Sequence, residues 1–388
     1  MKTAFAACRL FTPVEEIKDP VLLVEDGRIS DVYSRSEKEV STQIPVLDFS
    51  DSILTPGYID IHTHGGAGVD LMRASPSDYS RLDRFLASHG VAAYFPTTVA
   101  APLDATFAAL DRLAGAIETE EENGGAGGGA RPLGIHLEGP FLSHKRRGVH
   151  PPENLVEPTI PIFDRLWQAA RGHVRMVTIA PELPGAMEVI TEAVRRGVCI
   201  SIGHSDAEIS VAQQAVKAGA RHATHTFNAM RPLDHRDPGI VAEVLTEDQL
   251  SADIIVDGIH VSPPVVKLFL KAKGTERAVL ITDSIAAAGM PDGHYQLGPI
   301  EVEVKDGKCT SGGSLAGSVL TMDLAVRNVT RFSEWSLRDA VRAASLNPAH
   351  SAALAGHGAL KAGARADFLV LNSGGEVLKT FVGGKECV

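Results

Sequence analysis

The segment Asp60-Ile61-His62-Thr63-His64 places two imidazoles two residues apart, and Gly65-Gly66 follows it. Side chains alternate along a strand, so His62 and His64 are expected to point the same way. The glycines are expected to end the strand, which puts both imidazoles at its carboxyl end. Two neutral imidazoles on one face suit Zn²⁺ or Fe²⁺. Two surface histidines are the alternative explanation of so short a motif.

Four further polar side chains each follow a segment that is expected to be a strand. Taken singly, each has an ordinary structural explanation as a cap, a turn residue or one side of a salt bridge. Together they would bring carboxylates and imidazoles to the same edge of a sheet, where burying them is costly without a metal ion. They are Glu138 in His136-Leu137-Glu138-Gly139-Pro140, His204 in Gly203-His204-Ser205, His225 in His222-Ala223-Thr224-His225 and Asp283 in Thr282-Asp283-Ser284.

A set of histidines and carboxylates indicates a catalytic metal site. Structural zinc sites are usually closed by four ligands and are rich in cysteine, whereas this set leaves room for a water molecule. A bound divalent ion lowers the pKa of such a water to roughly 7 and polarises a carbonyl group. Asp283 is then the expected general base, which takes the proton of the water and returns it to a leaving amine.

The elements that would position these residues alternate in type along the middle of the chain. Eight strand-like segments are separated by helix-like stretches such as 76–89, 185–196 and 207–217, which predicts an α/β fold with a (β/α)8 TIM-like barrel. A doubly wound open sheet is the alternative, although it would more often have fewer strands. The expected strands are 59–63, 92–97, 133–137, 175–179, 198–202, 222–226, 252–256 and 278–282.

Both ends of the chain are rich in strand-like segments. Asp26-Gly27 separates two such segments and predicts a hairpin. We therefore expect residues 1–54 and 355–388 to form one small β-sandwich domain beside a barrel of residues 55–354. A β-hairpin insertion is expected near 289–311, with its turn at Asp306-Gly307. The acidic and glycine-rich run 118–130 is expected to be a solvated loop without function.

The composition excludes several classes of function. The chain has 388 residues, of which 44% are hydrophobic and 22% charged, as in an ordinary globular protein. Its 37 Lys and Arg against 48 Asp and Glu give a net charge of −11, which argues against binding to nucleic acid or an anionic membrane. Four widely separated cysteines, with no apolar N-terminal segment, indicate a cytoplasmic protein with free thiols.

Motifs over nearly the whole chain resemble the N-acetylglucosamine-6-phosphate deacetylase family of the amidohydrolase superfamily. The Glu-Gly-Pro and Phe-Asn-Ala-Met blocks are those that separate this family from its superfamily relatives. The segments concerned are Pro56-Gly57-Tyr58-Ile59-Asp60, His136-Leu137-Glu138-Gly139-Pro140-Phe141, Gly203-His204-Ser205, His225-Thr226-Phe227-Asn228-Ala229-Met230, Asp257-Gly258-Ile259-His260, Leu280-Ile281-Thr282-Asp283-Ser284, Ser314-Leu315-Ala316-Gly317-Ser318 and Asn347-Pro348-Ala349.

The resemblance implies an activity and roles for particular residues. The activity would be hydrolysis of N-acetyl-D-glucosamine 6-phosphate to D-glucosamine 6-phosphate and acetate. The implied roles are Glu138, His204 and His225 for the metal, Asp283 as catalytic acid and base, His150 near the acetyl group, Asn228, the Ala229 backbone, Arg236 and His260 for the sugar phosphate, and Leu315, Ala316 and Gly317 along the sugar. A homodimer is also implied, because Arg236 would reach the site of the neighbouring subunit.

The number and identity of the metal ions stay open at this point. Some members of the family lack the first histidine pair and bind one ion, whereas this chain keeps His62 and His64. One or two ions per subunit are therefore expected, with the Glu138–His204–His225 site filling first. We expect zinc, with iron, manganese or cobalt as alternatives.

Two other functions are weighed against this one. A cyclic amidase or deaminase of the same superfamily would commonly carry a carboxylated lysine on the fourth strand, but residues 174–180 contain no lysine. A different N-acyl sugar or amino acid as substrate is still compatible with the motifs. A barrel that serves only as a scaffold would lack metal ligands, and here every expected ligand is present.

Overall fold

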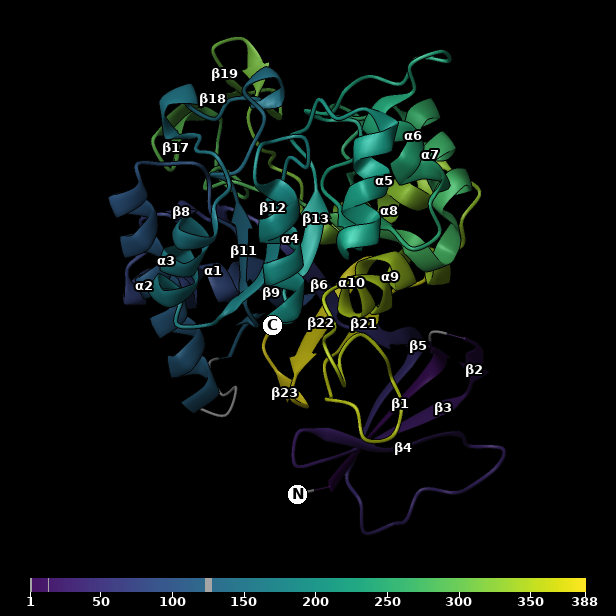
Figure 1. Ribbon diagram of the computed structural model, residues 1–388. Coiled ribbons are helices and arrows are strands. Elements are labelled where there is room, and N and C mark those ends of the chain that lie inside the picture. The colour runs from purple at the N-terminus through teal and green to yellow at the C-terminus, as the bar shows by residue number, and fades with distance from the viewer. Residues whose placement is uncertain (1, 13, 123–127) are drawn as a thin grey trace.

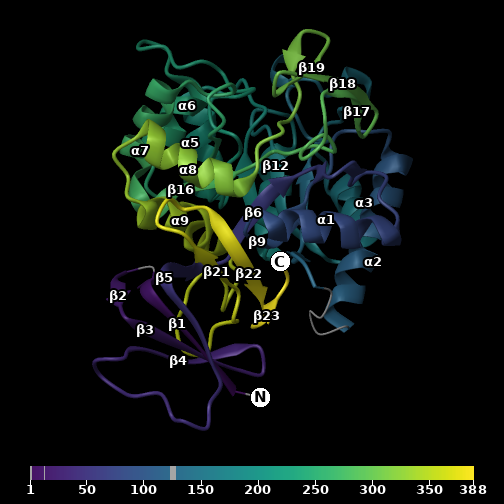
Figure 2. The ribbon, with the colours of Figure 1, turned by 180° about the vertical axis from the view of Figure 1, so that it is seen from behind.

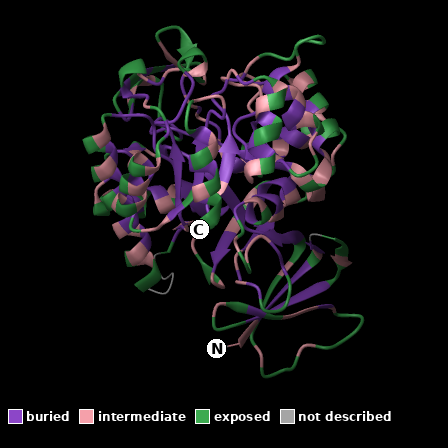
Figure 3. Cartoon of the chain, viewed as in Figure 1, coloured by how far each residue is buried: buried purple, intermediate pink, exposed green. Residues whose placement is uncertain are grey.

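The computed structural model describes residues 2–12, 14–122 and 128–388. A sheet built from both termini lies at one end of the molecule, and helices surround parallel strands in the larger part above it (Figures 1 and 2). The parallel strands are buried, whereas the outer faces of the helices are exposed (Figure 3). Within the described ranges, no helix combines the length and the apolar character that crossing a membrane requires.

Among the described residues, nine parallel strand segments form two sheets in the middle of the chain, and their carboxyl ends carry the candidate site residues. One sheet has the order β10-β9-β6 and another the order β11-β12-β13-β14-β15-β16. Parallel bridges join the two sheets on both sides, from Thr97 to His136 and from Thr63 to Ser284. The strands are β6 (Tyr58–Thr63), β9 (Val91–Pro96), β10 (Arg131–Pro132), β11 (Ile135–Glu138), β12 (Val174–Ile179), β13 (Cys199–Ile202), β14 (His222–Ala223), β15 (Ser251–Ile255) and β16 (Ala278–Ile281).

Each of the eight central strands expected from the sequence is present, but one is much shorter than expected. Strand β14 ends at Ala223, whereas the apolar pattern predicted a strand to residue 226. The reason is that the backbone turns at once: φ is 31° at His225 and 80° at Phe227, in the left-handed region that a strand does not use. The turn brings His225 to the edge of the sheet.

Local sequence signals account for the ends of several helices. Ser75 and Asp78 form a capping box at the start of α1, where Pro76 occupies the first turn. Gly219 ends α5 with φ of 114°, as expected for a C-terminal glycine. The helices are α1 (Pro76–Ser88), α2 (Leu103–Glu122), α3 (Ile160–Ala169), α4 (Ala186–Arg195), α5 (Ile209–Ala218), α6 (Gly239–Thr246), α7 (Pro263–Arg277), α8 (Met322–Phe332), α9 (Leu337–Ala344) and α10 (Leu346–Ser351), with short 3₁₀ turns at His144–Arg146 and Pro152–Asn154.

The acidic part of the 118–130 run is helical, so its prediction as a loop is wrong for residues 118–122. Helix α2 continues to Glu122. The helix is held there by ion pairs, because Arg171 lies 2.6 Å from Glu118 and Arg131 lies 3.4 Å from Glu120. The glycine-rich residues 123–127 lie outside the described residues.

The two termini pair directly with each other in one sheet. Its strand order is β23-β22-β21-β5-β1-β3-β4, with β2 paired to β1. Strand β21 runs antiparallel to β5, and Leu54 lies opposite Val370. The rings of Phe368 and Phe381 stack at 4.5 Å within the core of this sheet. The strands are β1 (Lys2–Phe11), β2 (Glu16–Lys18), β3 (Pro20–Glu25), β4 (Arg28–Ser34), β5 (Val46–Pro56), β21 (Phe368–Leu371), β22 (Val377–Val382) and β23 (Lys385–Glu386).

A small antiparallel sheet follows the last parallel strand. It contains β17 (Gly293–Leu297), β18 (Ile300–Lys305), β19 (Lys308–Ser311) and β20 (Ser314–Leu315), so it has more strands than a hairpin and continues beyond residue 311. Strands β18 and β19 are joined at Asp306-Gly307. Its apolar residues pack against Met72, Val99 and Ile285, which fixes the sheet over the edge where the parallel strands end. A short antiparallel pair, β7 (Gly65–Gly66) with β8 (Val69–Asp70), directly follows β6 in the sequence.

Candidate metal centre and its cavity

The ends of the first and last parallel strands are joined by their backbones. The N–H of Asp283 donates to the carbonyl oxygen of His62 at 2.9 Å, and the N–H of His64 donates to the carbonyl oxygen of Ser284 at 2.8 Å. Asp283 adopts φ of 50°, so the chain turns there and leaves the direction of β16. As a result the Asp283 carboxylate lies beside the two imidazoles of β6.

Glu138, the last residue of β11, lies at the centre of one buried group. Its Oε1 is 3.2 Å from Nε2 of His204 and 3.0 Å from Nε2 of His225. These two nitrogens are 3.1 Å from each other. All three side chains are buried, and their ligand atoms lie within 4.8 Å of one another, a spacing that a single metal ion could bridge.

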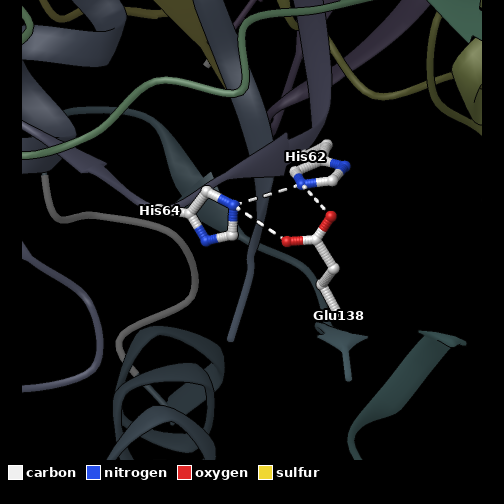
Figure 4. A group of neighbouring side chains, drawn as sticks. All are labelled: His62, His64 and Glu138. Atoms are coloured by element: carbon white, nitrogen blue, oxygen red, sulfur yellow. Dashed lines mark hydrogen bonds and ion pairs between the residues drawn. The ribbon is translucent and has the colours of Figure 1, made fainter. Parts of the chain in front are cut away.

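The same carboxylate belongs to a second buried group with His62 and His64 (Figure 4). Nε2 of His64 lies 3.3 Å from Oε2 of Glu138, and Nε2 of His62 lies 3.6 Å from Oε1. The two imidazole Nε2 atoms are 3.2 Å apart. The two histidines point the same way, as the alternation along the strand predicted. Oε1 of Glu138 thus faces nitrogens of both groups, whereas Oε2 faces His64.

Backbone carbonyl groups orient the rings of three of these histidines. Nδ1 of His204 lies 2.8 Å from the carbonyl oxygen of Arg146, and Nδ1 of His225 lies 3.1 Å from that of Asn228. Nδ1 of His64 lies 3.2 Å from the carbonyl oxygen of Thr97. A carbonyl can only accept, so each Nδ1 carries the proton and the Nε2 atom is the one available for a metal.

These contacts match the chemistry of a divalent cation. Imidazole nitrogens that lie about 3 Å apart around a carboxylate are the donors that zinc and similar ions prefer. The residues of both groups therefore fit a metal ion.

The charges in the cluster are strongly coupled. Burial lowers the pKa of His204 to about 4, so this ring is neutral. Burial also opposes charge on His64, but its hydrogen bonds to Asp283 and Glu138 outweigh burial and raise the pKa of His64 to about 10. Burial opposes ionisation of Asp283 as well, yet the hydrogen bond from His64 and the charges of His62 and His64 hold its pKa at about 2. Metal ligands of this kind exchange protons for the ion when it binds.

His150 lies next to the cluster with the opposite tautomer. Its Nδ1 accepts a hydrogen bond of 3.2 Å from the backbone N–H of Ala100. Because an amide N–H can only donate, Nδ1 is unprotonated and the proton of the neutral ring lies on Nε2. This Nε2 is 3.6 Å from Oε2 of Glu138. His150 thus presents a hydrogen-bond donor beside the candidate metal ligands.

A cavity of about 310 Å³ opens over these residues. It has the size of a small-molecule site, and several polar groups converge on it, as in sites that orient a ligand. Its wall contains Glu138, Asp283 and four of the histidines already described, His64, His150, His204 and His225, together with the expected residues Asn228, Ala229, His260, Leu315 and Gly317.

Three expected residues are not among the described residues that line this cavity: Arg236, Ala316 and His62, whose side chain is fully buried. Arg236 is exposed on the loop before α6, where its backbone N–H donates to Asp234. Ala316 is buried in the core under the small antiparallel sheet, and only its neighbours face the cavity.

The sequence analysis missed several residues of the cavity wall, namely Val99, Gly148, Val149, Leu297 and Ser314. Val99 follows the second parallel strand, and Leu297 and Ser314 belong to the insertion after the eighth. The rule that sites gather at the carboxyl ends of such strands could have identified these segments.

His136 packs against the cluster through the ring of His62, inside the sheet. Its ring is fully buried, with Nδ1 2.9 Å from the carbonyl oxygen of Ile61 and Nε2 2.8 Å from Oγ1 of Thr178. It packs edge-on against the ring of His62, with centroids 4.7 Å apart. Both nitrogens of His136 are thus occupied, and burial lowers its pKa well below the usual value. His136 holds the first strand in place and belongs to neither metal-binding group.

Comparisons with known proteins agree with this arrangement. Residues 53–387 match the model of the amidohydrolase family. The N-acetylgalactosamine-6-phosphate deacetylase of Escherichia coli O157:H7 is 37% identical over 99% of both chains. The N-acetylglucosamine-6-phosphate deacetylase of Bacillus subtilis (strain 168) is 36% identical over 97% of this chain and 94% of its own.

A solved structure is similar along the whole chain. It is a variant of N-acetyl-D-glucosamine-6-phosphate deacetylase from Mycobacterium smegmatis in complex with N-acetyl-D-glucosamine 6-phosphate. It is 32% identical, has a TM-score of 0.92, and the match covers 100% of this chain and 99% of that one. The family that the sequence motifs predicted is confirmed: the chain belongs to the amidohydrolase family and is a hydrolase.

Proposed function

We propose that this chain hydrolyses N-acetyl-D-glucosamine 6-phosphate to D-glucosamine 6-phosphate and acetate, in the breakdown or recycling of amino sugars. One observation carries the proposal: a cavity of about 310 Å³ combines the Glu138–His204–His225 group with the Asp283 carboxylate and a neutral histidine donor, His150. The names of the relatives support the same reaction on a phosphorylated N-acetyl sugar.

The architecture proposed with this function is a closed (β/α)8 barrel. The two parallel bridges between the sheets, Thr97 to His136 and Thr63 to Ser284, support closure. We propose a barrel of residues 55–354 with an insertion near 289–311, and a small β-sandwich domain of residues 1–54 and 355–388. The pairing of β5 with β21 supports the joint domain of the termini.

We propose zinc as the bound ion, with iron, manganese or cobalt as alternatives, and one or two ions per subunit. Glu138, His204 and His225 would hold the first ion, and His62 and His64 with Glu138 would hold a second. When bound, a divalent ion here supplies a positive charge that polarises an amide carbonyl and makes a water molecule more acidic.

Asp283 is the proposed general base and acid. Its Oδ1 lies 3.1 Å from Nε2 of His64 and 3.6 Å from Nε2 of His62, so it borders the space above both histidine groups. Its low pKa keeps it ionised at neutral pH and able to accept a proton. It takes the proton of the attacking water and delivers it to the nitrogen of the leaving amine.

His150 is proposed to stabilise the negative charge that develops on the acetyl oxygen. The N–H of Ala100 keeps the proton of His150 on Nε2, so the ring can donate a hydrogen bond without being charged. A fixed donor of this kind acts more strongly on the transition state than on the ground state, because the oxygen gains charge during the reaction.

The sugar phosphate is proposed to bind where backbone and side-chain donors converge. Asn228, the Ala229 backbone and His260 border the cavity, and Asp257 orients His260 through a contact of 2.7 Å to its Nδ1. Leu315 and Gly317 border the cavity and would line the sugar, whereas Ala316 between them is buried and would only support this wall. A phosphate dianion also favours the fork of an arginine. Arg236 is proposed to supply it to the neighbouring subunit of a homodimer, which agrees with its exposure here.

Two further points complete the proposal. The epimeric substrate N-acetylgalactosamine 6-phosphate is a second candidate, because the E. coli relative that carries this name matches over 99% of both chains. We propose a cytoplasmic location, which the free state of all four cysteines supports.

A matched kinetic comparison tests the function. Initial rates of acetate release would be measured for both phosphorylated sugars and for unphosphorylated N-acetylglucosamine, with and without a chelator. We expect the glucosamine phosphate to give the highest kcat/KM and the chelator to abolish turnover. Equal rates with and without the phosphate would contradict the proposed phosphate site, and a preference for the galacto epimer would favour the second candidate.

A further inference from the structure

One loop surrounds the metal-ligand candidate His204 and also carries His150. The N–H of Ser143 donates to the carbonyl oxygen of His204 at 3.0 Å, and the carbonyl of Arg146 accepts from Nδ1 of the same histidine at 2.8 Å. The rings of His150 and His204 then meet edge-on, with centroids 4.8 Å apart at 86°. The loop Ser143–His150 therefore fixes both the metal ligand and the proposed carbonyl donor.

The loop has little spare room against the histidine. Gly148 adopts φ of 57°, and a Cβ added there would lie 3.3 Å from Cε1 of His204. Arg147 closes the loop through a hydrogen bond of 2.7 Å from its guanidinium to the carbonyl oxygen of His150. A small displacement of the loop would therefore move the His204 ring and the His150 ring together.

A carboxylate two residues after His204 attaches the loop to the strand end. Oδ1 of Asp206 lies 2.8 Å from Nε of Arg146, and Oδ2 lies 3.2 Å from Nζ of Lys145. Asp206 is itself fixed, because its N–H donates to Oε1 of Glu182 at 2.6 Å and Oε2 of Glu182 accepts from the Ser205 hydroxyl. Glu182 thus holds Asp206 in place at the end of β13.

The two cations that contact the Asp206 carboxylate differ in solvent exposure, whereas Arg231 contacts only the backbone carbonyl of Asp206. The side chain of Arg146 is 32% exposed, whereas that of Lys145 is 79% exposed. Exposed ion pairs contribute little because water and salt screen them. The Arg146 contact is also closer to the functional atoms, since the carbonyl of the same residue orients His204. A movement of Asp206 would therefore displace the His204 ring through the contact with Arg146 and not through the contact with Lys145.

We propose that Asp206 is a positioning residue that holds the loop Ser143–His150 against His204 through Arg146, and so sets metal affinity and the alignment of His150 together. This inference rests on the roles proposed above for His204 and His150. It makes a specific demand: loss of the Asp206 carboxylate must weaken metal binding and must also lower turnover of the fully metal-loaded enzyme.

Four variants of the full chain test this demand. Asp206→Ala and Arg146→Ala each remove the contact from one side. Asp206→Asn keeps one oxygen for Arg146, and Lys145→Ala removes only the exposed contact to the same carboxylate. The measurements are the zinc dissociation constant by competition with a chromogenic chelator, kcat and KM at saturating zinc, and hydrogen exchange of residues 143–150 in the metal-free protein.

We expect Asp206→Ala and Arg146→Ala to raise the zinc dissociation constant by about tenfold, since partners of metal-bound histidines have effects of this size. At saturating zinc, kcat should still be about tenfold lower with KM nearly unchanged, and exchange in the loop should be faster. Asp206→Asn should recover most of both losses. Lys145→Ala should stay within about twofold of the parent chain in every measurement.

Other outcomes would overturn the inference. Unchanged zinc affinity in both alanine variants, full recovery of kcat at saturating zinc, or an effect of Lys145→Ala as large as that of Arg146→Ala would each contradict it. A parent chain that neither binds zinc nor releases acetate would instead refute the proposed function. Because Arg146 lies at the surface, its alanine variant keeps the test decisive even if Asp206→Ala folds poorly.

Discussion

Nε2 of His64 lies 3.1 Å from Oδ1 of Asp283, although the two residues follow different strands, the first and the last of the parallel sheet segments. The contact exists because the backbones of those strands pair at their carboxyl ends, where His64 donates to Ser284. A carboxylate at this position is held ionised by the neighbouring imidazoles. It can therefore accept a proton from a molecule in the cavity that Asp283 borders.

Asp283→Asn should remove this proton acceptor and little else. The amide has the same shape, so we expect the metal content to stay unchanged while kcat falls by about 10²- to 10⁴-fold. Metal content would be measured by elemental analysis and kcat by acetate release. Asp104→Asn, at the exposed start of α2, is the control. Turnover close to that of the parent chain would mean that another group is the base.

His150→Gln should separate carbonyl stabilisation from metal binding. Loss of the fixed Nε2–H donor should reduce kcat by about 10²- to 10³-fold, as for other donors to a developing oxyanion. The zinc dissociation constant should change much less, because Glu138, His204 and His225 are retained. His144→Ala removes an exposed histidine of the same loop and serves as the control. A change confined to KM would argue against the proposed role.

The two candidate metal sites should differ in importance. His204→Gln removes a ligand of the first site and should abolish most activity along with the tightly bound ion. His64→Gln should leave one ion bound per subunit and retain measurable turnover, because the first site stays intact. Titration with zinc, followed by elemental analysis after gel filtration, measures the stoichiometry of each variant. Retention of the ion in His204→Gln and its loss in His64→Gln would reverse the assignment.

A pH-dependent effect on stability is expected at Asp83. Burial raises the pKa of Asp83 to about 7, although the hydrogen bond from Tyr94 acts in the opposite direction. A carboxyl whose pKa is raised in the folded chain stabilises it at low pH, and this contribution is lost as the pH rises through about 7. Asp83→Asn should therefore gain roughly 3 kcal/mol relative to the parent chain between pH 4.5 and pH 8.5.

Chemical unfolding of both proteins at several pH values measures this difference. The asparagine can still accept the hydrogen bond that Tyr94 donates at 2.8 Å. Asp104→Asn, at the start of α2, is a control carboxylate of another helix. A difference between Asp83→Asn and the parent chain that does not vary with pH would mean that the carboxyl titrates alike in the folded and unfolded chains.

The proposed dimer predicts complementation between two inactive variants. If Arg236 acts in the neighbouring site, a mixed dimer of Arg236→Ala and Asp283→Asn contains one site with both functional residues. An equal mixture refolded together should then recover about one quarter of the parent activity, since half of the dimers are mixed and each has one complete site. Each variant alone is the control. Activity no greater than the average of the two would place Arg236 in its own subunit's site or outside any site.

The sequence could predict the residues of the candidate centre because strand periodicity and strand ends carry the information. His62 and His64 share a face through simple alternation, and Glu138, His204, His225 and Asp283 each follow a recognisable apolar segment. The backbone geometry at these ends was not predictable in the same way. Left-handed φ values at His204, His225 and Asp283 depend on contacts between neighbouring strands, so β14 proved shorter than its apolar pattern.

The remaining differences have related causes. The acidic end of α2 is read as a loop from its composition, but Arg171 and Arg131 come from distant segments to pair with it. The wall formed by Leu297 and Ser314 depends on how the small antiparallel sheet packs over Val99 and Ile285. Asp206 likewise has no motif of its own, and its contact with Arg146 exists only because β11 and β13 end at the same edge.

The pairing of β5 with β21 has a consequence for the newborn chain on the ribosome. The edge of β5 that contains Leu54 can pair only after Val370 of β21 has been synthesised. At typical translation speeds of roughly 5 to 20 residues per second, the delay is about 15 to 60 s. During this interval β5 keeps an unpaired edge, and a nascent chain with such an edge is prone to aggregate. Chaperones that bind nascent chains would therefore be needed most at the N-terminal strands.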